Sequence, residues 1–351
     1  MKPLPVSVVG RVRTEPLSPP MPHGSKAFIH QWPGVYFEAA FRGDRVALAF
    51  DDTANEYRLT VDGSQPLTIA QPGRAQFKIT GLHAGLHHLR LEKVTESIDR
   101  IGAFDGFYVP ADERPAPVRQ RARQIEFIGD SAMTGYGLRS SKLQCTQEEI
   151  RLTSDTQRAF PAIVAKRFDA DYQVIAVSGR GLVRNYGGST PGHAMLQAYP
   201  YTEIDGSRVY ADASWRPQII LISLFNDIAT DLQPGEKWKN LDELGGDYVT
   251  GYRQLIDELH RRSPSATLLL VWPDDSQAGD DPHMRDLMHT VRRGVEDAGA
   301  RAGAKLAFFS VTVDGAENTA CDHHGNLRGH ELIAATLTRY LEAHPALWQA
   351  R

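Results

Sequence analysis

A serine hydroxyl placed directly after a short apolar run is the feature of this sequence best suited to chemistry. Residues 125–128 have the composition of a buried strand, and the run stops at Gly129-Asp130-Ser131, a turn-prone tripeptide. Ligands bind at the carboxyl ends of strands in an open α/β sheet, so a serine there is placed to act as a nucleophile. The tripeptide alone is more often a simple strand-ending turn, and other stretches must decide between the two interpretations.

The chemistry that such a serine could perform is acyl transfer, which needs further groups. A base must take the hydroxyl proton, and hydrogen-bond donors must stabilise the negatively charged oxygen of the tetrahedral intermediate. Candidate groups follow later apolar runs: Gly179 after residues 173–177, Asn226 after residues 218–224, and a histidine block at residues 321–330. Taken singly, Gly179 would be a turn residue and Asn226 a strand-end cap.

The elements that must position these groups form a regular alternation after residue 123. Short apolar runs occur at residues 125–128, 173–177, 218–224, 267–272 and 305–310. Between and after them, apolar residues recur at helical spacing, as at 249–259, 287–295 and 333–341. Strands that alternate with helices predict a parallel sheet covered on both faces, with every candidate group at the same edge.

The first part of the chain has a different pattern. Apolar residues alternate at 35–41 and again at 46–50, and the turn at residues 42–44 between them predicts a hairpin. A second hairpin is predicted at Asp62-Gly63. Short strands with turns every ten or so residues predict an antiparallel β-sandwich of the jelly-roll type.

A chain of 351 residues exceeds what one core usually organises, so we expect two domains. Prolines and charges concentrate at residues 111–123, which we interpret as a linker. The predicted organisation is therefore a β-sandwich over residues 1–110, the linker, and an α/β domain over residues 124–351.

The order of the chemical blocks resembles that of the SGNH, or GDSL, hydrolases over about residues 123–341. Longer stretches resemble carbohydrate esterase family 2, namely Gly-Asp-Ser-Ala-Met-Thr-Gly-Tyr-Gly, Ser-Gly-Arg-Gly-Leu-Val-Arg-Asn-Tyr and Asp-His-His-Gly. Members of that family carry an N-terminal jelly roll before a three-layer α/β/α hydrolase domain. The resemblance implies an esterase that removes acetyl groups from plant-wall polysaccharides or oligosaccharides of the xylan or mannan type.

The resemblance also implies the roles of the nucleophile and the base. Ser131 would be the nucleophile and His324 the general base and acid, with His323 as the alternative histidine. Many SGNH enzymes have an aspartate three residues before the histidine, but Cys321 stands there. Family 2 esterases often use a Ser–His dyad whose histidine is oriented by a backbone carbonyl, so the resemblance implies such a dyad here, with Asp322 as the alternative third member.

The same comparison implies an oxyanion hole. It would consist of the Ser131 N–H, the Gly179 N–H and the Asn226 side chain, with Gly181 as the alternative glycine. The family's third block usually reads Gly-x-Asn-Asp, and Leu224 replaces its glycine here. A bulkier residue at this strand end could reshape the floor of the site.

Two other functions stay open. A carbohydrate-binding protein on the same fold with weakened catalysis is suggested by Leu224 and by Gly325, which stands where a proline usually follows the histidine. A general short-chain or lipase-like esterase is the other. Of the two cysteines, Cys145 follows the Gly-Asp-Ser stretch and Cys321 precedes the proposed catalytic histidine. A disulfide and two free thiols are both open, because pairing needs Cα atoms within about 7 Å.

Other aromatic and histidine residues have less specific patterns. Trp215 and Trp272 are candidates for stacking on a sugar, although core packing explains both. We interpret His83, His87 and His88 as solvated surface residues. The histidine block contains metal-ligand residue types, but adjacent side chains rarely bind one ion, so we expect no metal. Glycine motifs for nucleotides are absent, so we expect no cofactor.

Charge and hydrophobicity limit the partners. A net charge of −4 gives no electrostatic basis for binding nucleic acid. No apolar run approaches the roughly 20 residues of a membrane span, so we expect no membrane partner. Residues 1–10 show no apolar stretch of a signal peptide. The family resemblance implies a secreted or periplasmic protein, and a cytoplasmic one is the alternative.

Overall fold

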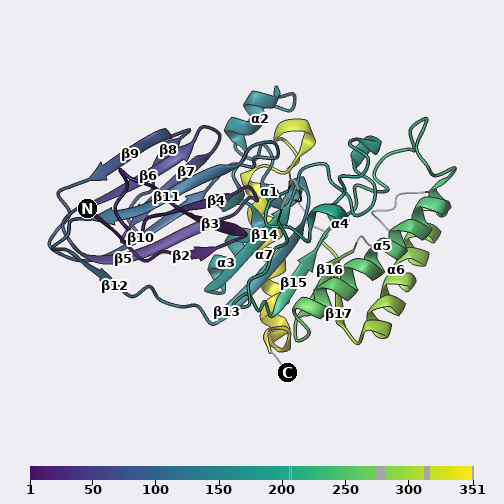
Figure 1. Cartoon of the computed structure of the whole chain (residues 1–351). Helices are drawn as coiled ribbons and strands as arrows, with labels where there is room; N and C mark the ends of the chain where they lie inside the picture. Colours follow the sequence, from purple (N-terminus) through teal and green to yellow (C-terminus); the bar gives the residue numbers. More distant parts are fainter. Residues whose placement is uncertain (205, 207, 273–280, 312–316, 350–351) are drawn as a thin grey trace.

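The structure is a computed structural model that describes residues 1–204, 206, 208–272, 281–311 and 317–349. The N-terminal part consists of antiparallel strands and the C-terminal part of alternating strands and helices (Figure 1). One sheet has the spatial order β3 (Val12–Pro16), β4 (Lys26–His30), β11 (Gly102–Val109), β6 (Val46–Asp52) and β9 (Gly73–Ile79), with β1 (Lys2–Pro3) beside β11. The other has the order β12 (Arg114–Ala116), β5 (Tyr36–Gly43), β10 (Gly85–Lys93), β7 (Glu56–Val61) and β8 (Leu67–Ala70), with β2 (Ser7–Val9) beside β5.

The two sheets enclose one apolar core, which confirms the predicted β-sandwich. Phe37 of β5, Phe50 of β6 and Phe104 of β11 are fully buried in it. The rings of Phe37 and Phe104 lie 4.9 Å apart between centroids. Alternate residues of each strand therefore point inward, as the period of two in the sequence predicts.

One of the two predicted hairpins is wrong. β7 and β8 do pair around Asp62-Gly63, with Leu59 opposite Leu67. β5 and β6 belong to different sheets, so the turn at residues 42–44 carries the chain across the sandwich. Glu113 holds this turn, since its Oε1 accepts a hydrogen bond from the Asp44 N–H at 3.1 Å. The period of two is the same for paired and opposed strands, so it could not distinguish them.

Residues 111–123, which we interpret as a linker from their composition, pack against both parts of the molecule. β12 lies within this segment and pairs with β5, with Pro115 opposite Phe41. The Arg121 guanidinium donates to Glu38 of β5 at 2.8 Å and to Asp171 of the α/β part at 3.0 Å.

All five predicted runs of the second part are strands of one parallel sheet. Its order is β14 (Ala170–Ala176), β13 (Arg123–Gly129), β15 (Ile219–Ile222), β16 (Thr267–Val271) and β17 (Lys305–Phe309). Consecutive residues of a strand serve opposite faces: Phe127 packs toward one layer of helices and Ile128 toward the other.

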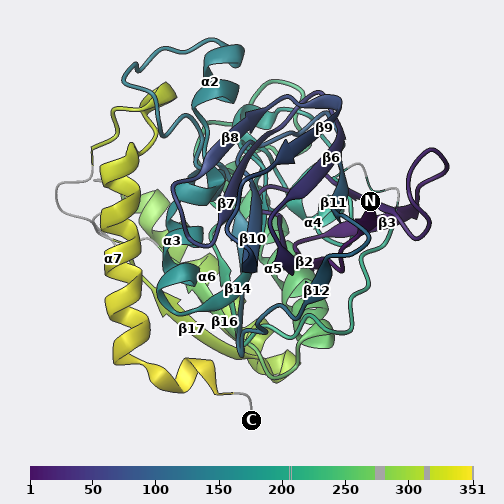
Figure 2. The same ribbon diagram turned by 90° about the vertical axis from the view of Figure 1, so that its left-hand side faces the viewer.

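Helices cover both faces of this sheet, as predicted. α3 (Phe160–Arg167) and α7 (Leu327–Ala343) lie on one face, and Figure 2 shows them side by side. α5 (Leu241–Arg262) and α6 (Pro282–Ala302) pack on the other face. The shorter helices are α1 (Ser131–Thr134), α2 (Gln147–Thr153) and α4 (Met195–Ala198). No helix in the described ranges combines the length and the apolarity needed to cross a membrane.

The sandwich and the α/β part share a buried polar contact around Arg11, whose side chain is fully buried. Its guanidinium lies 3.2 Å from the Glu126 carboxylate of β13 and donates to the Tyr201 carbonyl at 3.0 Å. The guanidinium also stacks on the Tyr199 ring, 4.4 Å from its centroid. The N-terminal segment is thereby anchored inside the second domain.

Candidate active site

A tight strand–turn–helix unit presents Ser131 at the carboxyl end of β13. Gly129 ends the strand, and a Cβ added there would lie 2.5 Å from the Met133 sulfur, so the turn requires a glycine. The Asp130 carboxylate accepts from the Ala132 N–H at 3.1 Å and caps α1. Ser131 is the first residue of α1, so its own N–H has no partner within the helix.

The structure brings Ser131 and His324 together, although 193 residues separate them in the chain. His324 Nε2 lies 2.8 Å from Ser131 Oγ, and His324 Nδ1 lies 2.9 Å from the carbonyl oxygen of Cys321. Because a carbonyl can only accept, Nδ1 carries the hydrogen of the neutral ring. Nε2 therefore presents its lone pair to the serine hydroxyl, which is the arrangement a general base requires.

The other candidates of the histidine block point elsewhere. The Asp322 carboxylate accepts from the Tyr136 hydroxyl at 2.8 Å. The His323 side chain is exposed, and the hydrogen bond to Ser131 comes from His324. Asp322 and His323 have φ values of +52° and +59°, a left-handed turn that presents the following residue to the serine. Sequence analysis did not single out Tyr136, whose ring packs on the His324 imidazole at 4.4 Å between centroids.

A disulfide joins Cys145 and Cys321, whose Cα atoms are 5.5 Å apart. Cys321 also supplies the carbonyl that orients His324, so the bond fixes the position of that carbonyl. The next residue is tethered as well, since the Asp322 N–H donates to the Leu143 carbonyl at 2.6 Å. Gly137 makes room for the bond, because a Cβ there would lie 2.6 Å from the Cys321 Cβ.

The two glycines after β14 have different environments. The Gly181 N–H donates to Asn185 Oδ1 at 3.3 Å, and a Cβ on Gly181 would lie 2.1 Å from the Arg184 carbonyl oxygen. Gly179 has a φ of +77° and open space where a Cβ would be. Within the described part of the chain, neither the Gly179 N–H nor the Ser131 N–H donates to a protein acceptor. The Gly181 N–H is thus occupied and its Cα is closely packed, whereas the Gly179 N–H is available to donate a hydrogen bond.

Asn226 follows β15 at the same edge of the sheet. Its amide nitrogen lies 3.0 Å from Asp130 Oδ2 and 3.0 Å from the Arg180 carbonyl oxygen, so both amide hydrogens have acceptors. The residue that replaces the usual glycine, Leu224, is buried in the core beside Tyr248. Its side chain therefore packs in the core of the domain.

Asp227 connects two of the site's loops, a role that sequence analysis missed. Its carboxylate accepts from three consecutive backbone N–H groups, those of Leu182 at 2.6 Å, Val183 at 2.7 Å and Arg184 at 2.8 Å. The loop that carries Gly179 is therefore bound to the end of β15. Three charge-assisted hydrogen bonds of this kind hold residues 182–184 firmly in place.

The sandwich also contributes to the site through Glu96. Its carboxylate accepts from the Ser178 N–H at 2.7 Å and from the Ser178 hydroxyl at 2.5 Å. The Ser178 hydroxyl lies 3.0 Å from the Thr134 hydroxyl of α1. Glu96 thereby links the residue before Gly179 to the helix that carries Ser131. Burial raises the pKa of Glu96, and its hydrogen bonds to Ser178 oppose that shift.

A cavity of about 610 Å³ opens between the two domains beside Tyr136 and Ser178. Its other walls are the sandwich loop around residues 96–100 and one face of α2; the lining includes Gln71, Asp99, Arg100, Gln147, Glu148 and Arg151. The two tryptophans considered for sugar stacking are not part of it. Trp272 is buried against Phe225 and Phe308, and Trp215 donates to the buried Glu126 carboxylate at 3.1 Å.

Both parts of the chain match known protein families. The family described as Carbohydrate esterase 2 N-terminal matches residues 9–118, and the GDSL-like Lipase/Acylhydrolase family matches residues 127–332. An acetylxylan esterase / glucomannan deacetylase of Cellvibrio japonicus is 37% identical over 99% of this chain and 93% of the relative. The cellulase/esterase CelE of Acetivibrio thermocellus is 29% identical over 90% of this chain, which covers 37% of that larger protein.

Solved structures superpose on nearly the whole chain. A carbohydrate esterase whose active site has divergent catalytic and non-catalytic binding functions superposes with a TM-score of 0.88 at 36% identity, covering 99% of this chain and 100% of that one. A family two carbohydrate esterase from Clostridium thermocellum in complex with cellohexaose has a TM-score of 0.76 at 26% identity, covering 98% and 100% of the two chains.

The fold and the Ser–His site thus define a hydrolase of the SGNH, or GDSL, class. Within that class, the matching N-terminal domain and the full-length relative are specific. The chain belongs to carbohydrate esterase family 2.

Proposed function

We propose that this protein removes acetyl groups from plant-wall polysaccharides or oligosaccharides of the xylan or mannan type. The observation that carries the proposal is the 2.8 Å contact between His324 Nε2 and Ser131 Oγ, with Nδ1 bound to a backbone carbonyl. The name of the Cellvibrio japonicus relative supports the substrate class, since it combines acetylxylan and glucomannan.

The reaction would proceed in two halves. Ser131 Oγ attacks the acetyl carbonyl carbon while His324 Nε2 takes the hydroxyl proton. The N–H groups of Ser131 and Gly179 stabilise the oxyanion, and His324 returns the proton to the departing sugar oxygen. Water, deprotonated by His324, then attacks the acetyl-enzyme and releases acetate.

Asn226 would complete the oxyanion hole by exchanging a partner. Both of its amide hydrogens have acceptors, Asp130 and the Arg180 carbonyl. When the charged intermediate forms, the N–H that donates to the neutral Arg180 carbonyl would donate to the oxyanion instead, since a hydrogen bond to a charged acceptor is the stronger one.

The interdomain cavity beside Tyr136 is the proposed place for the sugar chain. Its polar lining, with two arginines, two glutamines and three carboxylates, offers hydrogen bonds to hydroxyl groups. The cavity is lined by both domains, so the proposed role of the sandwich is to form one wall of the substrate groove. A carbohydrate is the proposed partner, with no nucleic acid or membrane.

The test combines substrate and mutation. Wild-type protein is expected to release acetate from acetylated xylan and glucomannan, and p-nitrophenol from its acetate far faster than from its octanoate. Ser131→Ala and His324→Asn should lower kcat by at least about 10³-fold. The controls Ser141→Ala, an exposed serine in the next loop, and His323→Asn should retain wild-type rates.

Other outcomes would select the other functions. If the wild-type protein binds oligosaccharides without turnover, it is a carbohydrate-binding protein. Preference for octanoate would identify a lipase-like esterase. We also propose export to the periplasm or the cell exterior, because a disulfide such as Cys145–Cys321 persists in oxidising compartments.

A further inference from the structure

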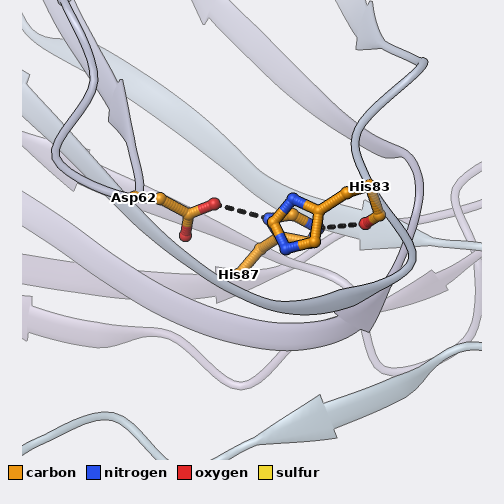
Figure 3. Close-up of side chains that lie close together, drawn as sticks. All are labelled: Asp62, His83 and His87. Atoms are coloured by element: carbon orange, nitrogen blue, oxygen red, sulfur yellow. Dashed lines mark hydrogen bonds and ion pairs between the residues drawn. The ribbon is translucent and has the colours of Figure 1, made fainter.

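Three metal-ligand side chains meet at an edge of the sandwich, in a place that the esterase reaction does not use. Asp62 lies in the turn between β7 and β8, His83 in the loop before β10, and His87 on β10 itself. Figure 3 shows the three side chains converging, with the two imidazoles beside each other and the carboxylate directed at His87. One ligand atom from each lies within 4.8 Å of the other two.

The contacts within this cluster are short. His87 Nδ1 lies 2.6 Å from Asp62 Oδ2, and the rings of His83 and His87 are 4.4 Å apart between centroids. Gly85 leaves room for this approach, because a Cβ there would lie 3.0 Å from His83 Nε2. Our interpretation of His87 as a solvated surface residue is wrong, since its side chain is fully buried. Asp62 and His83 are exposed, so an ion can reach the cluster from solvent.

Backbone groups orient two of the three ligands. His87 Nε2 lies 2.7 Å from the His83 carbonyl oxygen, which fixes the hydrogen on Nε2 and directs the Nδ1 lone pair at Asp62. The second carboxylate oxygen, Asp62 Oδ1, accepts from the His88 N–H at 2.7 Å. Metal-binding histidines and carboxylates are typically held by such outer hydrogen bonds.

The pair of His87 Nδ1 and Asp62 Oδ2 also needs a cation. With the hydrogen of the neutral ring on Nε2, two acceptor atoms face each other over 2.6 Å. A proton can fill that place, and so can a metal ion that both atoms bind. The adjacent imidazole of His83 favours a metal ion, because a second nitrogen ligand has no part in a proton shared between His87 and Asp62.

We propose that Asp62, His83 and His87 form a binding site for one divalent transition-metal ion, with Zn²⁺ as the reference ion. Two imidazoles and one carboxylate suit Zn²⁺, Co²⁺, Ni²⁺ or Cu²⁺ and leave a position for water. Ligands about 2.0–2.2 Å from Zn²⁺ would be roughly 3.3 Å from each other. Rotation of the exposed His83 and Asp62 side chains can bring the His83 nitrogen nearer and widen the 2.6 Å contact between Asp62 and His87 to that spacing.

The bound ion would raise the free energy of unfolding of the sandwich. It would connect the β7–β8 turn to the start of β10, two places joined at present by hydrogen bonds. Lys93, at the other end of β10, contacts Gln157 of the hydrolase domain at 2.9 Å. His87 and Lys93 are six positions apart along the strand, which is roughly 20 Å. A site at this distance should leave the esterase turnover of the protein unchanged.

The experiment is titration of the full chain with Zn²⁺ after treatment with chelator. Wild type is expected to bind one Zn²⁺ per chain and to unfold at a higher temperature when Zn²⁺ is present. His83→Gln should weaken Zn²⁺ binding at least tenfold and abolish the thermal shift. The matched control is His88→Gln, an exposed neighbour on β10 whose side chain lies outside the cluster, and it should behave as wild type.

Co²⁺ gives an independent readout. Its visible absorption should appear in wild type and His88→Gln and be lost in His83→Gln. Asp62→Asn is a second variant that should also weaken binding, and circular dichroism checks that each variant is folded. Absence of Zn²⁺ binding by wild type at about 100 μM would overturn the proposal, and so would equal affinity in wild type and His83→Gln.

Discussion

The imidazole of His324 directs its Nδ1 hydrogen to the main-chain carbonyl of Cys321 over 2.9 Å. A backbone carbonyl thus holds the place that a carboxylate occupies in a Ser–His–Asp triad. The neighbouring carboxylate, Asp322, instead accepts from Tyr136.

The first prediction separates a dyad from a triad. Asp322→Asn should change kcat for p-nitrophenyl acetate by less than about fivefold, because the amide can still accept from Tyr136 and the tautomer of His324 is set elsewhere. In a Ser–His–Asp triad the equivalent change lowers kcat by about 10⁴. Steady-state kinetics decides, and a loss of about 10³-fold or more would make Asp322 the orienting group.

The second prediction concerns the disulfide. It links residues 176 apart, so the chain-entropy model assigns it about 5 kcal/mol of stability. The double variant Cys145→Ala/Cys321→Ala should lower the free energy of unfolding by about 3–5 kcal/mol. It should also lower kcat with little change in KM, because the carbonyl that orients His324 is no longer fixed.

Denaturant unfolding and kinetics measure the two effects. Adding a reductant to wild type should reproduce both, whereas the same reductant should leave the double variant unchanged. Equal unfolding midpoints for wild type and the variant would contradict the assigned role.

The third prediction tests whether the sandwich supports catalysis. Glu96→Gln should lower kcat roughly tenfold with KM little changed, since an amide can keep one of the two hydrogen bonds to Ser178 and not both. Asp99→Asn is the matched control, because it removes the same charge from an exposed position in the same loop. Equal losses in both variants would show that charge near the cavity, rather than the position of Ser178, is responsible.

The fourth prediction is a pH dependence of stability. Burial, together with the charges of Glu96 and Asp227, raises the pKa of Asp130 from 3.8 to about 6. The folded protein therefore binds a proton that the unfolded chain releases between these two values. The resulting stability is present below about pH 3.9 and is lost as the pH rises through 6.

Asp130→Asn removes this titration and keeps a side-chain oxygen for the cap of α1. Between pH 4 and pH 7.5, the free energy of unfolding of wild type should fall by about 2 kcal/mol relative to that of the variant. Urea unfolding at the two pH values gives the comparison. A difference between the proteins that is the same at both pH values would exclude a raised pKa at Asp130.

Much of the architecture could be predicted because the hydrophobic pattern of most segments matches their burial in the folded protein. Apolar runs bounded by turns became the strands of the parallel sheet, since strands buried on both faces need no alternation. The pairing of β5 with β10 rather than β6 could not be predicted, because alternation shows which face is buried and not which strand lies beside it. The burial of His87 depends in the same way on its surroundings, here the loop of His83.

The candidate site likewise contains residues that motifs indicate and residues that only tertiary packing brings there. Ser131 and His324 stand in blocks whose order is informative, so the sequence indicates them. Glu96 is a single glutamate in a loop with no motif around it, and its place at the site comes only from the packing of two domains. Tyr136 lies in a motif we noted, yet its contact with His324 depends on the turn at residues 321–323.

The insertion of Arg11 into the hydrolase part couples the stability of the two parts of the chain. Excising the catalytic half would leave the buried Glu126 carboxylate without its counter-ion, and breaking a buried pair in this way costs about 3–5 kcal/mol. A catalytic half expressed alone is therefore expected to unfold at a lower denaturant concentration than the full chain.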